Sequence, residues 1–301
     1  MTLSPARALT LTRTLMLPLA LACGSTPSTE SDASASATSS STATSEATSS
    51  STTAATTTAT ATTTSDTTTA TTDTSESTTA IDEPLRVFFV GNSYTFTNDL
   101  PTMVETIADG ATRPLDHQTV AVAGAKVVDH LANPAVIDAL AEPWDVVVLQ
   151  GQSFEPVFEP EDFVDAVVDF AAMMHPESEL VLFETWARRE GAGVLLDFGL
   201  TAAEMQEALT EGYAAAATAS GATVAPVGQA WAKSLSDAPR ITLHISDDSH
   251  PTVAGTFLAS SVFFEVLTGG DPTTNAFTPN GLDPADADTL EAIALAVVDG
   301  G

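Results

Sequence analysis

The segment Arg86-Val-Phe-Phe-Val-Gly-Asn-Ser-Tyr-Thr95 decides how this chain folds. Its apolar run is typical of a buried strand, and Gly91 indicates a tight turn after it that presents Ser93. A distant segment, Asp247-Asp-Ser-His250-Pro251, contains the residue types that activate a serine hydroxyl. Neither segment is sufficient alone, because Gly-Asn-Ser is common turn chemistry and a His before Pro often enters a helix. Together they indicate a hydrolase with a serine nucleophile.

Short apolar runs alternate with amphipathic stretches through the rest of the chain, which is the pattern of a parallel sheet covered by helices on both faces. The predicted strands are 85–90, 119–122, 145–149, 179–183 and 223–226. The predicted helices are 100–108, 161–174, 202–220, 252–267 and 284–298. We therefore expect an α/β protein, a three-layer α/β/α sandwich around a central parallel sheet.

The first 23 residues have the layout of a bacterial export signal. Arg7 and Arg13 precede the apolar run 15–22, which is much shorter than the roughly 20 residues of a membrane-spanning helix. A small residue directly before Cys23 resembles a lipobox, although Ala20 stands where Leu is usual. Cys23 is therefore either the lipidated N-terminus of an envelope lipoprotein or part of a cleaved peptide of an extracellular protein. Both alternatives predict an exported protein with residues 1–23 as its signal peptide.

Residues 24–80 are almost wholly Ser, Thr and Ala, which cannot bury enough apolar surface to fold, so we expect a disordered linker. Residues 81–301 remain, enough for one domain with a large core. This domain has 34 acidic and 7 basic residues, a formal charge of about −27. Such a charge argues against nucleic-acid and anionic-lipid partners, so membrane contact is expected only through an N-terminal lipid. The absence of a second cysteine excludes disulfides from the domain.

A serine hydroxyl reacts only when a base takes its proton and a third group orients that base. His250 is the preferred base, because Asp247 lies three residues before it and can reach the imidazole on one turn. Asp248 is the alternative carboxylate, and His244 is the alternative base. We expect Ser93, Asp247 and His250 to be the catalytic residues.

Cleavage of an ester also needs donors for the developing oxyanion, and losing one typically costs on the order of 3 kcal/mol of barrier. The candidates are the backbone N–H of Ser93, the backbone of Gly124 and the side-chain amide of Gln150. Seen singly, Gly124 is also an ordinary turn glycine and Gln150 an ordinary surface amide. All three residues, however, follow predicted strands. In open parallel sheets the carboxyl ends of the strands form one rim of the sheet, and ligands bind at that rim.

These motifs resemble those of the SGNH (GDSL-like) hydrolases over most of residues 85–269. Gly91-Asn-Ser-Tyr-Thr95 matches the first block, whose serine is the nucleophile. Asp247-Asp-Ser-His250-Pro-Thr252, followed by Gly255, matches the last block, whose Asp and His complete the triad. The resemblance implies a flavodoxin-like fold and ester cleavage through an acyl-enzyme.

The middle blocks of the family are matched less well. Ala123-Gly124-Ala125 keeps one glycine of the second block, and the third block, Gly-x-Asn-Asp, is absent. Gln150-Gly-Gln-Ser153 stands in its place and is similar to the Gln-Gly-Glu-Ser of the carbohydrate acetylesterase and sialate O-acetylesterase branches. In those branches the Gln replaces the Asn as oxyanion donor, which implies Gln150 here, with Gln152 as the alternative.

The function expected from these residues and this resemblance is hydrolysis of a small-molecule or carbohydrate ester, best an O-acetyl group on a carbohydrate. No phosphate-binding loop or zinc pattern is present, so no cofactor or metal is implied. Trp186 and the stretch 188–199 could form a wall or lid of the pocket, although Trp186 is equally consistent with core packing. Two alternatives remain, a non-catalytic glycan-binding surface protein and an acidic cation-binding protein.

Overall fold

The computed structural model describes residues 83–109, 111 and 113–300. The expected signal peptide, the lipidated Cys23 and the Ser/Thr-rich linker lie outside these residues.

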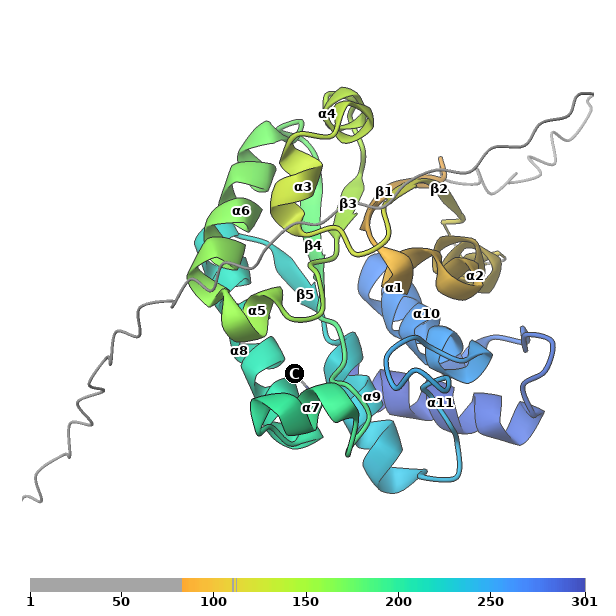
Figure 1. The fold of residues 1–301 in the computed structure, drawn as a ribbon. Coiled ribbons are helices and arrows are strands. Elements are labelled where there is room, and N and C mark those ends of the chain that lie inside the picture. The colour runs from red at the N-terminus through yellow and green to blue at the C-terminus, as the bar shows by residue number, and fades with distance from the viewer. Residues whose placement is uncertain (1–82, 110, 112, 301) are drawn as a thin grey trace, which may run out of the picture. The chain divides into compact units, whose positions relative to one another are not determined.

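The centre of the domain is a sheet of five parallel strands in the order β2-β1-β3-β4-β5 (Figure 1). The strands are β1 (Leu85–Gly91), β2 (Leu115–Ala121), β3 (Val146–Leu149), β4 (Glu179–Phe183) and β5 (Thr223–Ala225). This is the flavodoxin-like order, in which the direction of winding reverses between β1 and β3. The carboxyl ends of these two neighbours therefore flank the crevice where such folds bind their ligands.

Helices cover both faces of the sheet, which confirms the expected three-layer α/β/α class (Figure 1). One face is covered by α2 (Leu100–Ala108), α9 (Val227–Asp237), α10 (Val253–Thr268) and α11 (Pro284–Val298). The other is covered by α3 (Val127–Leu131), α4 (Pro134–Leu140), α6 (Pro160–Met173) and α8 (Ala202–Ser220). The remaining short elements are α1 (Ser93–Phe96), η1 (Thr97–Asp99), α5 (Glu155–Phe158), α7 (Gly193–Phe198) and η2 (Pro272–Thr274).

The side chains of β1 divide between two hydrophobic cores, as the period of two in a strand requires. Val87 and Phe89 belong to the core under α2 and α10, whereas Phe88 and Val90 belong to the core under α6 and α8. Phe263 of α10 meets Phe89 edge to face, with the ring centroids 5.9 Å apart. Because β1 is buried on both faces, its carboxyl end is a rigid platform for the turn that follows.

Local capping fixes where α8 and α10 begin and end. Thr201 and Glu204 form a reciprocal capping box at the start of α8. Thr252 caps α10 by accepting a hydrogen bond from the Gly255 N–H at 3.2 Å. Gly221 and Gly269 end the two helices in the left-handed conformation that glycine adopts at least cost. The cap at Thr252 also fixes the direction from which the preceding segment, 243–251, approaches the sheet.

Among the described residues, no helix combines the length and the apolar character needed to cross a bilayer.

Close packing of α10 against its neighbours depends on Gly255. A Cβ atom added there would lie 2.6 Å from a ring carbon of Trp231 and 2.7 Å from the Leu243 carbonyl oxygen. Because overpacking typically costs about 1–3 kcal/mol, we expect Gly255→Ala to lower the melting temperature by several degrees. Thermal unfolding followed by circular dichroism measures the change.

Gly193, the first residue of α7, is the matched control for this substitution. A Cβ atom added at Gly193 meets nothing within 4 Å. Gly193→Ala should therefore leave the melting temperature unchanged or raise it slightly, because it removes only the excess freedom of the unfolded chain. Equal melting temperatures for the two variants would contradict the packing argument.

Candidate active site

Ser93 occupies the turn between β1 and α1, and the side chain of Asn92 fixes that turn. Asn92 caps α1 by accepting a hydrogen bond from the Tyr94 N–H at 3.1 Å. Its Nδ2 donates to the Ala125 carbonyl at 3.1 Å, which ties the turn to the loop after β2. Ser93 is therefore presented at the carboxyl rim of the sheet in one orientation.

A chain of hydrogen bonds runs from Ser93 to His250 and Asp247. Ser93 Oγ lies 2.8 Å from His250 Nε2, and His250 Nδ1 lies 2.6 Å from Asp247 Oδ2. Since a carboxylate only accepts, Nδ1 carries the proton of the neutral ring, and Nε2 is left to accept from the serine hydroxyl. The structure thus brings together the three residues that the sequence singled out, in the order needed for nucleophilic catalysis.

Asp247 is held as a carboxylate. Burial opposes its ionisation, but hydrogen bonds from the His250 ring and from the backbone N–H groups of His250 and Ser249 outweigh this effect and lower the pKa of Asp247 to about 2. Its second oxygen, Oδ1, accepts from those two N–H groups at 2.9 and 3.0 Å. Asp247 can therefore orient His250 at any pH at which an ester assay is run.

Asp248 and His244, the alternative carboxylate and the alternative base, form contacts outside the triad. Asp248 pairs with Arg189, with Oδ1 3.3 Å from Nη1, and does not bond to His250. His244 is buried, and its Nε2 lies 3.0 Å from the Ala187 carbonyl oxygen. Neither takes part in the hydrogen-bond chain of Ser93, so the geometry favours Asp247 over Asp248 and His250 over His244.

The segment that carries Asp247 and His250 is folded back on itself and clamped. The Ile245 N–H donates to the His250 carbonyl at 2.9 Å, closing the loop between them. Arg189 Nη2 donates to the His244 and Ile245 carbonyls at 2.6 and 2.9 Å. An arginine from the loop after β4 therefore fixes the position of the loop before α10.

Gln150 lies beneath the nucleophile turn and not in a pocket. Its Oε1 accepts from the Asn92 N–H at 3.0 Å and from the Thr95 hydroxyl at 2.9 Å, and its Nε2 donates to the Gly151 carbonyl at 2.6 Å. The side chain is fully buried. The geometry therefore does not favour the Gln150 amide as an oxyanion donor, because both ends of the amide form hydrogen bonds inside the protein and Gln150 does not line the pocket beside Ser93.

A pocket of about 340 Å³ opens beside Ser93, and we call it the Ser93 pocket. Its lining residues are Asn92, Ser93, Tyr94, Ala123, Gly124, Gln152, Ser153, Arg188, Ser249 and His250. It thus contains the nucleophile, the candidate base and three of the residues considered as oxyanion donors, Ser93, Gly124 and Gln152.

Three donor groups of residues that line this pocket have no partner among the described residues: the backbone N–H groups of Ser93 and Gly124 and the side-chain NH₂ of Gln152. Gly124 has a φ of 70°, a conformation that favours glycine, and a Cβ there would meet nothing within 4 Å. Gln152 Oε1 accepts from the Phe154 N–H at 2.7 Å, which orients the amide and leaves its donor end free. The geometry therefore favours Gln152, the alternative residue of the Gln-Gly-Gln-Ser segment, as the oxyanion donor.

Glu155 joins the loops that carry Gly124 and Gln152. Its buried carboxylate accepts from the Gln152 N–H and, at 3.2 Å through Oε1, from the Val127 N–H at the start of α3. Burial raises the pKa of Glu155 to about 7, although these two N–H groups lower it. Sequence reasoning missed this residue, because an acid in the first turn of a helix is ordinary and carries no special signal.

The loop after β4 contributes fewer residues to the wall of the Ser93 pocket than the sequence suggested. Trp186 is buried and stacked between Tyr94 and Trp231, with ring centroids 4.4 and 3.9 Å apart, so the packing interpretation of Trp186 is correct. Of the stretch 188–199, only Arg188 lines the Ser93 pocket.

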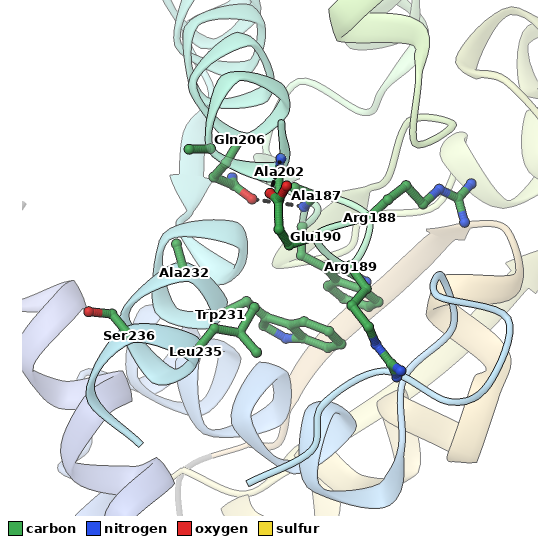
Figure 2. Close-up of a pocket in the computed structure, with 12 residues that line it drawn as sticks. Ala187, Arg188, Arg189, Glu190, Ala202, Gln206, Trp231, Ala232, Leu235 and Ser236 are labelled. Carbon is green, nitrogen blue, oxygen red and sulfur yellow. Dashed lines mark hydrogen bonds between the residues drawn. The ribbon is translucent and has the colours of Figure 1, made fainter. Parts of the chain in front are cut away.

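A second pocket, of about 460 Å³, lies between α8, α9 and the loop after β4, and we call it the Trp231 pocket. Figure 2 shows it lined by apolar and small side chains such as Leu235, with Arg189, Glu190 and Gln206 at its edge. It contains no serine paired with a histidine. Within the described part of the chain, no group of three or more His, Cys, Asp or Glu residues is arranged to hold a metal ion.

Comparison with known proteins identifies the fold. No known family model and no curated protein matches the chain. Among solved structures, a proposed SGNH hydrolase from Slackia heliotrinireducens matches with 29% identity and a TM-score of 0.55, over 62% of this chain and 100% of the other. A DUF4886 family protein from Bacteroides uniformis matches with 18% identity and a TM-score of 0.64, over 72% of this chain and 95% of the other. The chain has the SGNH hydrolase fold, and it is similar in sequence to a protein of that superfamily. Its placement near the Gln-Gly-x-Ser branches stays a prediction.

The raised pKa of Glu155 makes a prediction about stability. The pKa of Glu155 is about 7 in the folded protein, whereas a glutamate carboxyl ordinarily has a pKa of 4.5. Between about pH 4.5 and 7, Glu155 therefore keeps its proton in the folded protein but loses it in the unfolded chain. This contribution therefore destabilises the protein as pH rises through that range. Glu155→Gln removes it, so the melting temperature of the variant relative to wild type should increase from pH 5 to pH 8.

Glu265→Gln is the matched comparison, because burial also raises the pKa of Glu265 to about 7 on α10. It should shift the relative melting temperature in the same direction. A difference between Glu155→Gln and wild type that is the same at pH 5 and pH 8 would show that Glu155 is ionised throughout.

Proposed function

We propose that this protein is a serine hydrolase that cleaves an ester, most specifically an O-acetyl group on a carbohydrate. The observation that carries the proposal is the hydrogen-bond chain from Ser93 through His250 to Asp247. The SGNH fold supports the hydrolase class, and the similarity to the Slackia protein supports it further. The carbohydrate acetyl substrate rests on the resemblance of the Gln-Gly-Gln-Ser segment to acetylesterase branches, which is analogy at the level of the family.

In the proposed reaction, Ser93 Oγ attacks the ester carbonyl carbon while its proton moves to His250 Nε2. The negative charge that forms on the carbonyl oxygen is stabilised by the N–H groups of Ser93 and Gly124 and by the Gln152 amide. Collapse of this intermediate breaks the bond to the alcohol oxygen, which takes the proton from His250 as it leaves. Asp247 orients His250 and stabilises the imidazolium during both transfers.

The acyl-enzyme is then hydrolysed by the same residues. A water molecule gives a proton to His250 Nε2 and attacks the acyl carbon, and when the second intermediate collapses His250 returns that proton to Ser93 Oγ as the carboxylic acid leaves. The Ser93 pocket, about 340 Å³ in volume, favours a short acyl group such as acetyl over a long chain. We further propose that the protein acts outside the cytoplasm, on the strength of the signal-like N-terminal sequence.

The nucleophile is tested with 4-nitrophenyl acetate and butyrate as substrates. Ser93→Ala should abolish hydrolysis, because no other group replaces the serine oxygen, and a fluorophosphonate should add covalently to Ser93 in the wild type. Release of 4-nitrophenol and peptide mass spectrometry provide the two measurements. A folded wild type that neither hydrolyses these esters nor takes up the label would instead favour the glycan-binding alternative.

The neighbouring acids give a matched control for the triad. Asp247→Asn should lower kcat by about 10³- to 10⁴-fold, the loss typical when a triad carboxylate becomes an amide. Asp248→Asn should change kcat far less, because Asp248 pairs with Arg189 and not with His250.

Substitutions of Gln150 and Gln152 should have different effects, one on the stability of the protein and the other on its catalytic rate. Gln152→Ala removes a proposed oxyanion donor and should lower kcat by about 10²- to 10³-fold while the melting temperature stays close to wild type. Gln150→Ala leaves the Asn92 N–H and the Thr95 hydroxyl without an acceptor, at about 1–3 kcal/mol for each buried group, so it should lower the melting temperature. If Gln152→Ala leaves kcat within twofold of wild type, Gln152 is not an oxyanion donor.

A further inference from the structure

Arg188 stands out among the cations of this acidic domain. Five of its seven basic residues, Arg113, Lys126, Arg189, Lys233 and Arg240, each form an ion pair with a carboxylate. Arg86 donates to the Pro143 carbonyl and lies over the Trp144 ring. Arg188 has no carboxylate partner among the described residues, although acidic residues outnumber basic ones 34 to 7 in the domain. The Arg188 guanidinium therefore forms no ion pair with a described carboxylate, whereas most of the other basic side chains of the domain do.

The guanidinium is nevertheless held firmly in place. Arg188 Nη2 donates to the Ser153 hydroxyl at 2.9 Å. The guanidinium carbon lies 4.9 Å from the ring centroid of Phe154 and 5.9 Å from that of Tyr94. Aromatic rings attract a cation without neutralising it. Arg188 therefore has a fixed orientation, a full positive charge and N–H donors that no described residue uses.

This charge belongs to the Ser93 pocket. Arg188 lines that pocket together with Ser93 and His250, and none of the residues lining it is Asp or Glu. Figure 2 shows the Arg188 guanidinium directed away from Trp231 and Leu235, so the charged group does not serve the Trp231 pocket, which only its stem borders. In a domain with a charge of about −27, this pocket is lined by one arginine and no acid, and the neighbouring carboxylate of Asp247 is engaged by His250.

From this arrangement we propose that Arg188 binds a carboxylate of the substrate, so that the natural substrate is an ester of an acidic molecule, such as an acidic sugar. The proposal rests on the proposed function and specifies its substrate class. A guanidinium matches a carboxylate with two parallel hydrogen bonds, which makes arginine the residue suited to this recognition. The charges on the rest of the surface repel an anion only weakly at this site, because salt screens them beyond about 8 Å at physiological ionic strength.

Two pairs of esters test the proposal, and in each pair the neutral member differs from the anionic one by methylation of the carboxylate. On the alcohol side the pair is 4-acetoxybenzoate and its methyl ester, and on the acyl side it is mono-4-nitrophenyl succinate and its methyl ester. Spontaneous hydrolysis is subtracted with Ser93→Ala. Wild type should prefer the anionic member of at least one pair by tenfold or more in kcat/KM.

The variants separate a specific contact from a general effect of charge. Arg188→Gln should lower kcat/KM for the preferred anionic ester by about 10- to 100-fold, mainly through KM, and change the neutral ester by less than threefold. Arg188→Lys should restore part of the preference, since it keeps the charge but loses the bidentate geometry. Lys233→Gln removes a charge that pairs with Asp237 at the surface of α9, and it should leave the preference unchanged.

Binding provides a readout that does not depend on catalysis. Calorimetric titration of 4-acetoxybenzoate and mono-4-nitrophenyl succinate into Ser93→Ala should show binding that is lost in Ser93→Ala/Arg188→Gln. If wild type hydrolyses both neutral esters but shows no preference for either anionic one, the carboxylate site is wrong and the esterase stands. If no ester is hydrolysed but the anionic ester binds through Arg188, the esterase is wrong and the carboxylate site stands. An equal loss of activity on both members of a pair in Arg188→Gln would show a structural role and overturn the proposal.

Discussion

A buried glutamine amide joins the ends of the two central strands, and the arrangement of the site depends on it. Gln150 directly follows β3. Its side-chain oxygen, Oε1, accepts hydrogen bonds from the Asn92 N–H and the Thr95 hydroxyl, which belong to the turn after β1 and the helix that it starts. Gly91 makes this approach feasible, since a Cβ there would lie 2.7 Å from Gln150 Oε1. A buried donor without an acceptor would destabilise the folded protein, because no water is present to replace the acceptor. The turn therefore has one stable conformation, which gives the Ser93 side chain one direction.

The other loops of the rim are fixed to this centre by buried or partly buried polar groups and not by regular secondary structure. Asn92 connects the nucleophile turn to the loop after β2, and Glu155 connects that loop to the loop after β3. Arg189 connects the loop after β4 to the segment that carries Asp247 and His250. Residues distant in sequence thus meet at hydrogen-bond distance, which is the kind of fixed arrangement that catalysis by electrostatic stabilisation requires.

The sequence was sufficient to predict the fold class and most of the elements, because caps and breakers bound them. Helices α2, α8 and α11 have the predicted limits. Strand β2 begins at Leu115, four residues before the prediction, because it is an edge strand where Asp116 and Gln118 tolerate exposure and hide the apolar pattern. Helix α9 was missed, since Gly228 and its polar neighbours break the helical period.

The candidate site was predicted in part. The serine, the histidine and its carboxylate have specific spacings, and the structure brings them together. The choice between Gln150 and Gln152 depended on which amide leaves the core, and that is decided by the packing around Gly91 and Thr95, which no short motif encodes. Glu155 and Arg188 act through contacts with residues from other loops, so their importance becomes visible only when the loops are assembled.

The column of rings behind the site has an optical consequence. Trp186 and Trp231 stack nearly parallel at 3.9 Å, and Tyr94, which contacts the Trp186 face, meets the His250 ring edge to face at 5.5 Å. The chain has only three tryptophans, and the third, Trp144, lies in the opposite core against Phe88. Two indoles at this separation couple their electronic transitions, so the near-ultraviolet circular dichroism of the protein is largely a signal from the buried rings that pack behind Tyr94 of the Ser93 pocket. The molecule therefore contains a spectroscopic reporter of that region without any added label.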